Sequence, residues 1–186
     1  MTVIAPSPTR DSKFKDPITT LDGAKRAHVE LKALRTLWIN TGTLCNLTCE
    51  SCYIDSSPRN DRLAYIDIQD VRSYLDEIER DALPTREIGF TGGEPFMNPG
   101  LIDIMSLCLE RGFRVLVLTN AMRPMMKCAD GLLALHGLHG DQLTLRVSLD
   151  HYSAVRHEEL RGARSWQPTI EGISWLNANG FRVHIA

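Results

Sequence analysis

Strand-like apolar segments alternate with helical segments along most of this 186-residue chain. The expected strands are short runs of apolar and β-branched residues bounded by turn formers. They cover residues 36–40, 87–90, 113–118, 142–149 and 181–186. The expected helices lie between Asp67 and Pro84 and over residues 101–111, 123–136 and 168–179. This order predicts an α/β fold with a parallel sheet and right-handed crossovers.

Chemically unusual residues follow four of the expected strands. A cysteine-rich loop follows the first strand, and residues 92–95 (Gly-Gly-Glu-Pro) follow the second. Asn120 follows the third strand, and Asp150 follows the fourth. Because ligands bind at the carboxyl ends of the strands in parallel α/β sheets, these residues are expected to form one site.

Cys45, Cys49 and Cys52 form a C-x3-C-x2-C triplet within eight residues. Three thiolates on so short a loop can converge on one metal centre. A cubane iron–sulfur cluster usually takes four cysteines, so three leave one iron open. An open coordination position distinguishes a reactive metal site from a closed structural one. The triplet therefore favours a reactive iron–sulfur centre.

The alternative interpretation is a zinc-stabilised α/β binding module without catalysis. A structural zinc site needs a fourth ligand. It would come from His28, Cys108 or Cys128. Zinc loops favour C-x2-C pairs separated by a spacer, and this arrangement is not present. The cluster is therefore the preferred interpretation.

Composition and charge indicate which classes of protein this chain does not belong to. The formal net charge is −2 and 43% of the residues are hydrophobic, as in ordinary globular domains. No basic field supports nucleic-acid binding, and no apolar stretch reaches the roughly 18–20 residues of a membrane span. With no signal peptide and an odd number of cysteines, the expected location is the cytoplasm. Residues 1–34 are expected to be an N-terminal leader that is mobile in part.

The cysteine triplet, the strand before it and the Gly-Gly-Glu-Pro motif resemble the radical S-adenosylmethionine (SAM) superfamily. The resemblance covers about Leu37 to Ala186. Within the superfamily, Cys-Asn-Leu-x-x-Cys-x-x-Cys-Tyr is similar to the branch of molybdenum-cofactor, haem-d1 and peptide-modifying enzymes. The fold this implies is a partial parallel (β/α) barrel over residues 35–186. Since members commonly use six strands, the core is expected to be truncated after the fifth and incomplete at its C-terminus.

The resemblance also implies the cofactors and the chemistry. Cys45, Cys49 and Cys52 would hold a [4Fe–4S] cluster, and the methionine moiety of SAM would chelate the open iron. An electron donor such as flavodoxin or ferredoxin would reduce the cluster. Reductive cleavage of SAM would give a 5′-deoxyadenosyl radical that abstracts a hydrogen atom from an unknown substrate, a peptide or a cofactor precursor. Methylation or sulfur insertion is the weaker alternative within the same family.

SAM contacts are assigned by the same resemblance. Two glycines permit close backbone approach and a carboxylate accepts hydrogen bonds from an ammonium group, whereas the structural alternative is an ordinary turn. The cofactor-binding residues expected on this basis are Gly92, Gly93, Glu94, Pro95, Asn120, Ser148 and Asp150. Arg161 is a further candidate for the SAM carboxylate. Many members carry an aromatic residue just before the third cysteine, where this chain has Ser51, with Tyr53 just after the cysteine.

Overall fold

The computed structural model describes residues 16–186, and the chain divides into two units. The first unit ends at Lys32, and in it Thr19 and Lys25 form an isolated antiparallel bridge. The second unit spans Ala33–Ala186 and contains every helix and strand of the described residues. The expected leader lies partly outside the described residues, and its boundary with the core at residue 35 remains a prediction.

Five parallel strands form one sheet in the order β1-β2-β3-β4-β5. They are β1 (Thr36–Asn40), β2 (Glu87–Thr91), β3 (Arg114–Thr119), β4 (Leu143–Val147) and β5 (Arg182–Ile185). Each strand pairs with the next along the chain, so every connection runs the same way across the sheet. The expected α/β fold with a parallel sheet is confirmed, and all five strand ends meet at one edge.

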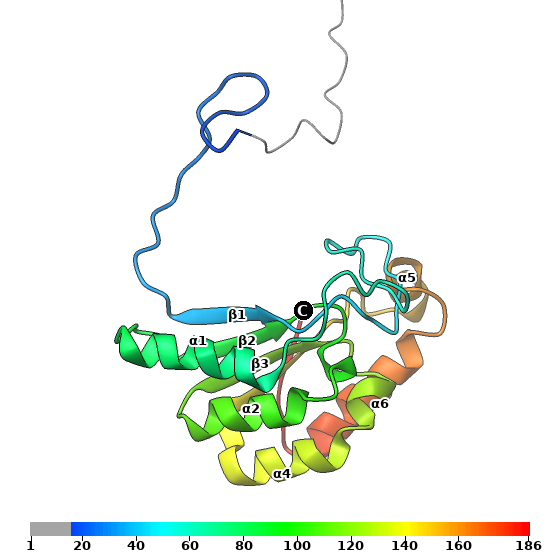
Figure 1. Cartoon of the computed structure of the whole chain (residues 1–186). Helices are drawn as coiled ribbons and strands as arrows, with labels where there is room; N and C mark the ends of the chain where they lie inside the picture. Colours follow the sequence, from blue (N-terminus) through cyan, green and yellow to red (C-terminus); the bar gives the residue numbers. More distant parts are fainter. Residues whose placement is uncertain (1–15) are drawn as a thin grey trace, which may run out of the picture. The chain divides into compact units, whose positions relative to one another are not determined.

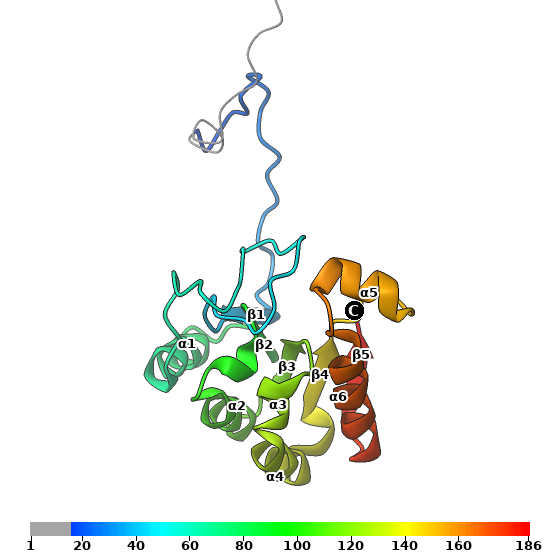
Figure 2. The same cartoon turned by 90° about the vertical axis from the view of Figure 1, so that its right-hand side faces the viewer.

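The helices that connect the strands cover one face of this sheet (Figures 1 and 2). They are α1 (Ile68–Arg80), α2 (Leu101–Glu110), α3 (Arg123–Met126), α4 (Ala129–His139) and α6 (Trp166–Ala178). The remaining helix, α5 (Ala154–Arg161), lies instead beyond the carboxyl ends of the strands (Figure 1). The covered face is the hydrophobic core. There Ile88 and Phe90 of β2 are fully buried together with Leu75 of α1 and Ile104 of α2. No helix in residues 16–186 is long and apolar enough to cross a lipid bilayer.

The opposite face of the sheet carries no helices. Trp38, Gly89, Leu116 and Thr144 are neighbours across it in register. The Trp38 side chain remains 45% exposed, and a Cβ atom on Gly89 would lie 2.4 Å from its ring. Gly89 therefore provides room for the indole ring flat against the sheet. This open face is the inner surface of a partial barrel.

The helix expected over residues 123–136 is two helices. Cys128 lies between them with φ −100° and ψ 13°, outside helical geometry, and α4 continues to His139. The change of direction packs α4 against α2, where Gly131 leaves little space beside Ile102. The stretch after β4 forms α5, for which no helix was expected, and α6 begins at Trp166 rather than at residue 168.

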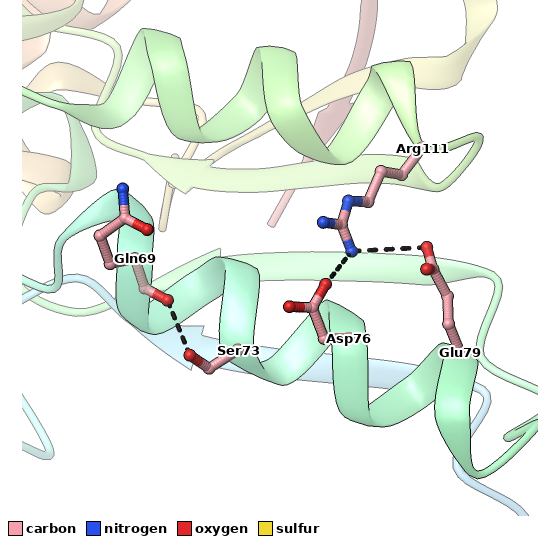
Figure 3. Close-up of polar contacts among 5 residues, drawn as sticks. All are labelled: Gln69, Ser73, Asp76, Glu79 and Arg111. Atoms are coloured by element: carbon pink, nitrogen blue, oxygen red, sulfur yellow. Dashed lines mark hydrogen bonds and ion pairs between the residues drawn. The ribbon is translucent and has the colours of Figure 1, made fainter.

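Helix α1 begins with a reciprocal cap and is tied to α2 at its other end. The Asp67 side chain accepts from the amides of Gln69 and Asp70, and the Asp70 carboxylate accepts from the Asp67 amide. Near the C-terminal end of α1, Arg111 donates to Asp76 at 2.6 Å and lies 3.5 Å from Glu79 (Figure 3). Exposed pairs of this kind contribute little stability, so the buried core holds the two helices together.

Candidate cofactor site

A cavity of about 200 Å³ lies at the carboxyl ends of the strands. It is bounded on one side by the cysteine loop and on the other by the residues that follow β2, β3 and β4. Of the predicted site residues, its lining contains Cys45, Cys49, Cys52, Gly92, Gly93, Glu94, Asn120, Ser148 and Asp150. Pro95 is the exception, because it is buried at the first position of the 3₁₀ turn Pro95–Met97. Residues from four separate segments therefore face one space.

The cysteine loop is held to the end of β2 by backbone hydrogen bonds. The amide of Gly93 donates to the carbonyl of Gly42 at 2.8 Å, and the amide of Glu94 donates to that of Leu44 at 3.0 Å. The loop closes on itself where the Cys45 amide donates to the Ser57 carbonyl at 3.1 Å. The position of the first cysteine is therefore fixed by main-chain contacts.

Both glycines after β2 are required by this contact. A Cβ atom on Gly93 would lie 2.1 Å from the carbonyl oxygen of Leu44. Gly92 has φ +137°, and a Cβ atom there would lie 2.6 Å from the carbonyl oxygen of Gly42. The two glycines were expected to let the backbone come close to a ligand. In the structure they let it come close to the cysteine loop.

The sulfur atoms lie in surroundings that suit metal-bound thiolates. The Cys45 sulfur accepts from the Leu47 amide at 3.4 Å, and the Cys52 sulfur accepts from the Ser56 amide at 3.3 Å. Burial raises the pKa of Cys45 to about 12 and also raises the pKa of Cys49. Without a cation these two thiols hold their protons, so a metal centre is what would convert them to thiolates. Amide donors to sulfur also help to set the potential of iron–sulfur clusters.

The spacing of these groups does not match a single metal ion. In residues 16–186, no group of three or more His, Cys, Asp or Glu side chains is close enough to hold one. Cys108 is fully buried in the core on α2. A cubane places its irons at separate corners and accepts a wider set of thiols than one ion does. The donor set therefore gives the zinc alternative no support, whereas three thiols around one cavity suit a cluster with one open iron.

Glu94 is a buried carboxylate that joins the ends of β2 and β3. It is 2% exposed. One oxygen accepts from the Thr119 hydroxyl at 2.8 Å and the Phe96 amide at 3.2 Å, and the other accepts from the Asn120 amide at 2.8 Å. Burial raises the pKa of Glu94 to about 7, although these donors oppose the shift. Its expected bond to an ammonium group would add to three bonds already made within the protein.

Asn120 is similarly engaged by the protein. Its side-chain Nδ2 donates to Asn46 Oδ1 at 2.9 Å, and its Oδ1 accepts from the Met122 amide at 3.1 Å. Its carbonyl accepts from the Thr169 hydroxyl at 3.1 Å. One hydrogen of the side-chain amide remains for a ligand. Asn46 lies inside the cysteine triplet, and the sequence analysis did not single it out.

Asp150 and Arg161 form a two-pronged ion pair beside the cavity. Arg161 Nε lies 2.5 Å from one Asp150 oxygen, and Nη2 lies 2.9 Å from the other. The guanidinium also opposes the burial effect on the pKa of Cys49. Ser148, whose amide donates to the Thr119 carbonyl at 3.0 Å, lines the same wall. Arg161 thus has a partner in the protein before any SAM carboxylate is considered.

Sequence reasoning gave no role to several residues that line the cavity, and it did not expect helix α5. Tyr53 and Leu118 line the cavity, and the Tyr53 hydroxyl lies 3.4 Å from the Thr91 hydroxyl. Helix α5 supplies Arg161, and its Leu160 carbonyl accepts a hydrogen bond from the Glu50 amide at 3.2 Å. Ser153 before α5 and Gly162 after it were the available signals for that helix.

The fold and the cavity together define a class: a partial parallel barrel with a three-cysteine centre at the carboxyl ends of its strands. Residues 39–186 match the family model of the Radical SAM superfamily. The chain therefore belongs to the radical SAM superfamily. A [4Fe–4S] cluster and SAM are the characteristic cofactors of this family.

Two curated relatives are named for bacteriocin biosynthesis and for mycofactocin maturation. The chain is 30% identical over 143 residues to the antilisterial bacteriocin subtilosin biosynthesis protein AlbA of Bacillus subtilis, covering 76% of this chain and 30% of AlbA. It is 30% identical over 138 residues to the mycofactocin maturase MftC of Mycobacterium ulcerans, covering 74% of this chain and 35% of MftC. The chain thus spans about a third of the length of these relatives.

Solved structures share the fold. SuiB of Streptococcus suis bound to S-adenosylmethionine superposes with a TM-score of 0.66 at 22% identity, over 81% of this chain and 33% of SuiB. SuiB bound to the precursor peptide SuiA gives a TM-score of 0.68 at 21% identity, over 83% and 33%. At 22% and 21% sequence identity, these matches show only that the folds are alike.

Proposed function

We propose that this chain binds a [4Fe–4S] cluster through Cys45, Cys49 and Cys52 and uses it to cleave SAM reductively. The observation that carries the proposal is that the three thiols share one cavity with the ends of β2, β3 and β4. Three protein ligands leave one iron of a cubane open. The amino and carboxylate groups of SAM would be the ligands for that position.

Protein groups around the cavity would hold SAM in place. The Gly92–Gly93 turn presents main-chain atoms beside the cysteine loop, and Glu94 retains one acceptor position for the SAM ammonium group. Ser148 and Asp150 offer the short polar side chains that suit ribose hydroxyls, with the Asp150 carboxylate oriented by Arg161. Arg161 adds a positive charge to the cavity wall that would attract the SAM carboxylate. Asn120 contributes its one remaining N–H.

When bound, the cluster and SAM supply a one-electron cleavage that yields methionine and a 5′-deoxyadenosyl radical able to take a hydrogen atom from the substrate. The chain itself would exclude water and fix the geometry. An external donor such as flavodoxin or ferredoxin would deliver the electron.

We propose a peptide as the substrate, with a cofactor precursor as the second candidate. The helix-free face of the sheet leads away from the cavity, since Leu118 of β3 lines the cavity and Leu116 lies two residues further along the same face. Two further observations support a peptide: one relative takes part in bacteriocin biosynthesis, and SuiB was solved with a precursor peptide. The second candidate, a small cofactor precursor, is supported by a relative named GTP 3′,8-cyclase, because that name indicates a nucleotide rather than a peptide as the substrate.

Anaerobic reconstitution of the chain with iron and sulfide tests the proposal. About four irons and four sulfides per chain are expected, together with a brown chromophore. The single variants Cys45→Ala, Cys49→Ala and Cys52→Ala should lose the chromophore, whereas the control Cys128→Ala should keep it. One zinc per chain and no colour would contradict the proposal.

A further inference from the structure

The middle of the cysteine loop is attached to the rest of the protein at two places. In the described residues, hydrogen bonds from residues 46–51 leave the loop only at Asn46 and at Glu50. The Glu50 bond goes to α5, in which four of the eight residues are exposed. The Asn46 side chain bonds to Asn120 and lies 3.6 Å from the Met122 sulfur. Cys49 lies between these two attachments, so its position depends on both.

Asn120 is the rigid partner of this contact. It is 5% exposed, and Glu94 and Thr169 hold its main-chain N–H and carbonyl. The Met122 amide bonds to its side-chain oxygen, which turns the NH₂ group toward Asn46. An amide held at three points offers a fixed donor, whereas Asn46 lies on a half-exposed loop.

The turn that carries Asn120 is also confined from behind. Ala121 is fully buried and has φ +57°, a left-handed conformation that a residue with a Cβ atom adopts only when its surroundings impose it. Gly172 of α6 supplies the surroundings, because a Cβ atom there would lie 1.8 Å from the Ala121 carbonyl oxygen. Helix α6 therefore packs closely against this turn and fixes its conformation.

From this geometry we infer that Asn46 and Asn120 form a latch that positions the cysteine loop on the end of β3 and thereby retards loss of iron from the cluster. Both are positioning residues, since they act through the loop that carries the three cysteines. The inference rests on the proposed function. It adds that cluster retention depends on one side-chain hydrogen bond between segments 74 residues apart.

A double-mutant cycle on the reconstituted 186-residue chain tests the latch. The measured quantity is the anaerobic rate at which a ferrous chelator removes cluster iron from wild type, Asn46→Ala, Asn120→Ala and the double variant. A single hydrogen bond predicts about fivefold faster release in each single variant. It also predicts about the same rate in the double variant, because the second substitution has no bond left to remove. Cluster absorbance at the start of the reaction and the melting temperature of the metal-free chain are measured in parallel.

Two further variants separate positioning from general damage. Asn46→Asp keeps an acceptor for the Asn120 NH₂ group, so release close to the wild-type rate is expected. Asn179→Ala removes an exposed amide hydrogen bond at the end of α6 and is also expected to release iron at the wild-type rate. If Asn120→Ala does not fold, the comparison of Asn46→Ala with Asn46→Asp decides the question.

The outcomes separate the latch from the proposed function. Multiplicative rates in the double variant, or equal release from Asn46→Ala and wild type, would overturn the latch while leaving the cluster assignment in place. The same holds if Asn46→Asp releases iron as fast as Asn46→Ala. A wild-type chain that takes up no iron at all would instead overturn the proposed function and the latch with it.

Discussion

At the scale of single residues, the buried side chains of Glu94 and Asn120 are satisfied by neighbouring groups of the site. Buried donors and acceptors are costly when left unpaired, and Glu94 and Asn120 meet that requirement through Thr119, Asn46 and Thr169. The groups proposed to face SAM are therefore also the groups that hold three strand ends together. Substitutions here are expected to affect stability and ligand binding at once.

Replacing Glu94 by alanine removes the acceptor for three donors while leaving the cysteines intact. The expected result is a chain that still takes up its cluster but binds SAM more weakly and loses about 2–3 kcal/mol of unfolding free energy. Binding isotherms for SAM and denaturant unfolding measure the two effects. Glu110→Ala, an exposed carboxylate on α2, is the matched control. Unchanged SAM affinity in Glu94→Ala would argue against its role.

Glu94 also predicts a pH dependence for the metal-free chain. Burial raises its pKa from 4.5 to about 7, so the folded chain holds this proton more tightly than the unfolded chain does. The resulting stabilisation is complete below pH 4.5 and is lost as the pH rises through 7. The loss is about 3 kcal/mol for a shift of this size. Urea unfolding of wild type and Glu94→Gln across this range measures it, and a constant difference between them would contradict the assignment.

At the scale of elements, the cavity depends on close contact between the turn after β2 and the cysteine loop. Gly92 and Gly93 permit that contact, and the hydrogen bonds at Gly42 and Leu44 make it continuous with the pairing of β1 and β2. The loop is thus an extension of the sheet edge as far as Cys45. Beyond Cys45 it depends on α5 and on the Asn46 side chain.

Gly93→Ala tests the backbone contact. The new methyl group would lie 2.1 Å from the Leu44 carbonyl oxygen, so the loop must move and cluster content should fall well below that of wild type. Gly137→Ala on α4 is the control, because its Cβ atom meets open space and alanine is favoured in a helix by about 1 kcal/mol. Iron and sulfide analysis measures the effect, and equal cluster content in both variants would contradict it.

Arg161→Leu tests the attachment of α5. Loss of the ion pair leaves the Asp150 carboxylate without its partner, and the end of α5 that accepts the Glu50 amide should loosen. We expect roughly tenfold faster hydrogen exchange at the Glu50 amide, the factor that corresponds to a two-pronged charged contact. Arg156→Leu, whose exposed pair with Glu159 lies on the same helix, should leave that exchange unchanged.

At the scale of the whole molecule, local patterns were sufficient to predict the sheet. Apolar runs identified all five strands, and the motifs after them marked the edge where the cavity lies. The sequence did not predict helix α5, because its apolar residues do not form a repeating buried face: Val155 is 69% exposed and Leu160 is 39% exposed. The contacts Asn46–Asn120 and Asp150–Arg161 join residues that no sequence spacing relates, and only the folded chain reveals them.

The described core places its chemistry at one end and leaves one sheet face without helices. One face therefore holds the molecule together, and the other is the face that we propose for a substrate. The chain spans about a third of the length of its curated relatives. The peptide substrate and its contacts are therefore proposed for this chain.

Anaerobic reconstitution followed by addition of SAM and a strong reductant tests the central claim most directly. We predict a brown protein with about four irons per chain that releases 5′-deoxyadenosine, and a colourless, inactive protein when Cys49 is replaced by alanine. A chain that takes up no iron, or that takes it up and yields no deoxyadenosine, would contradict the account.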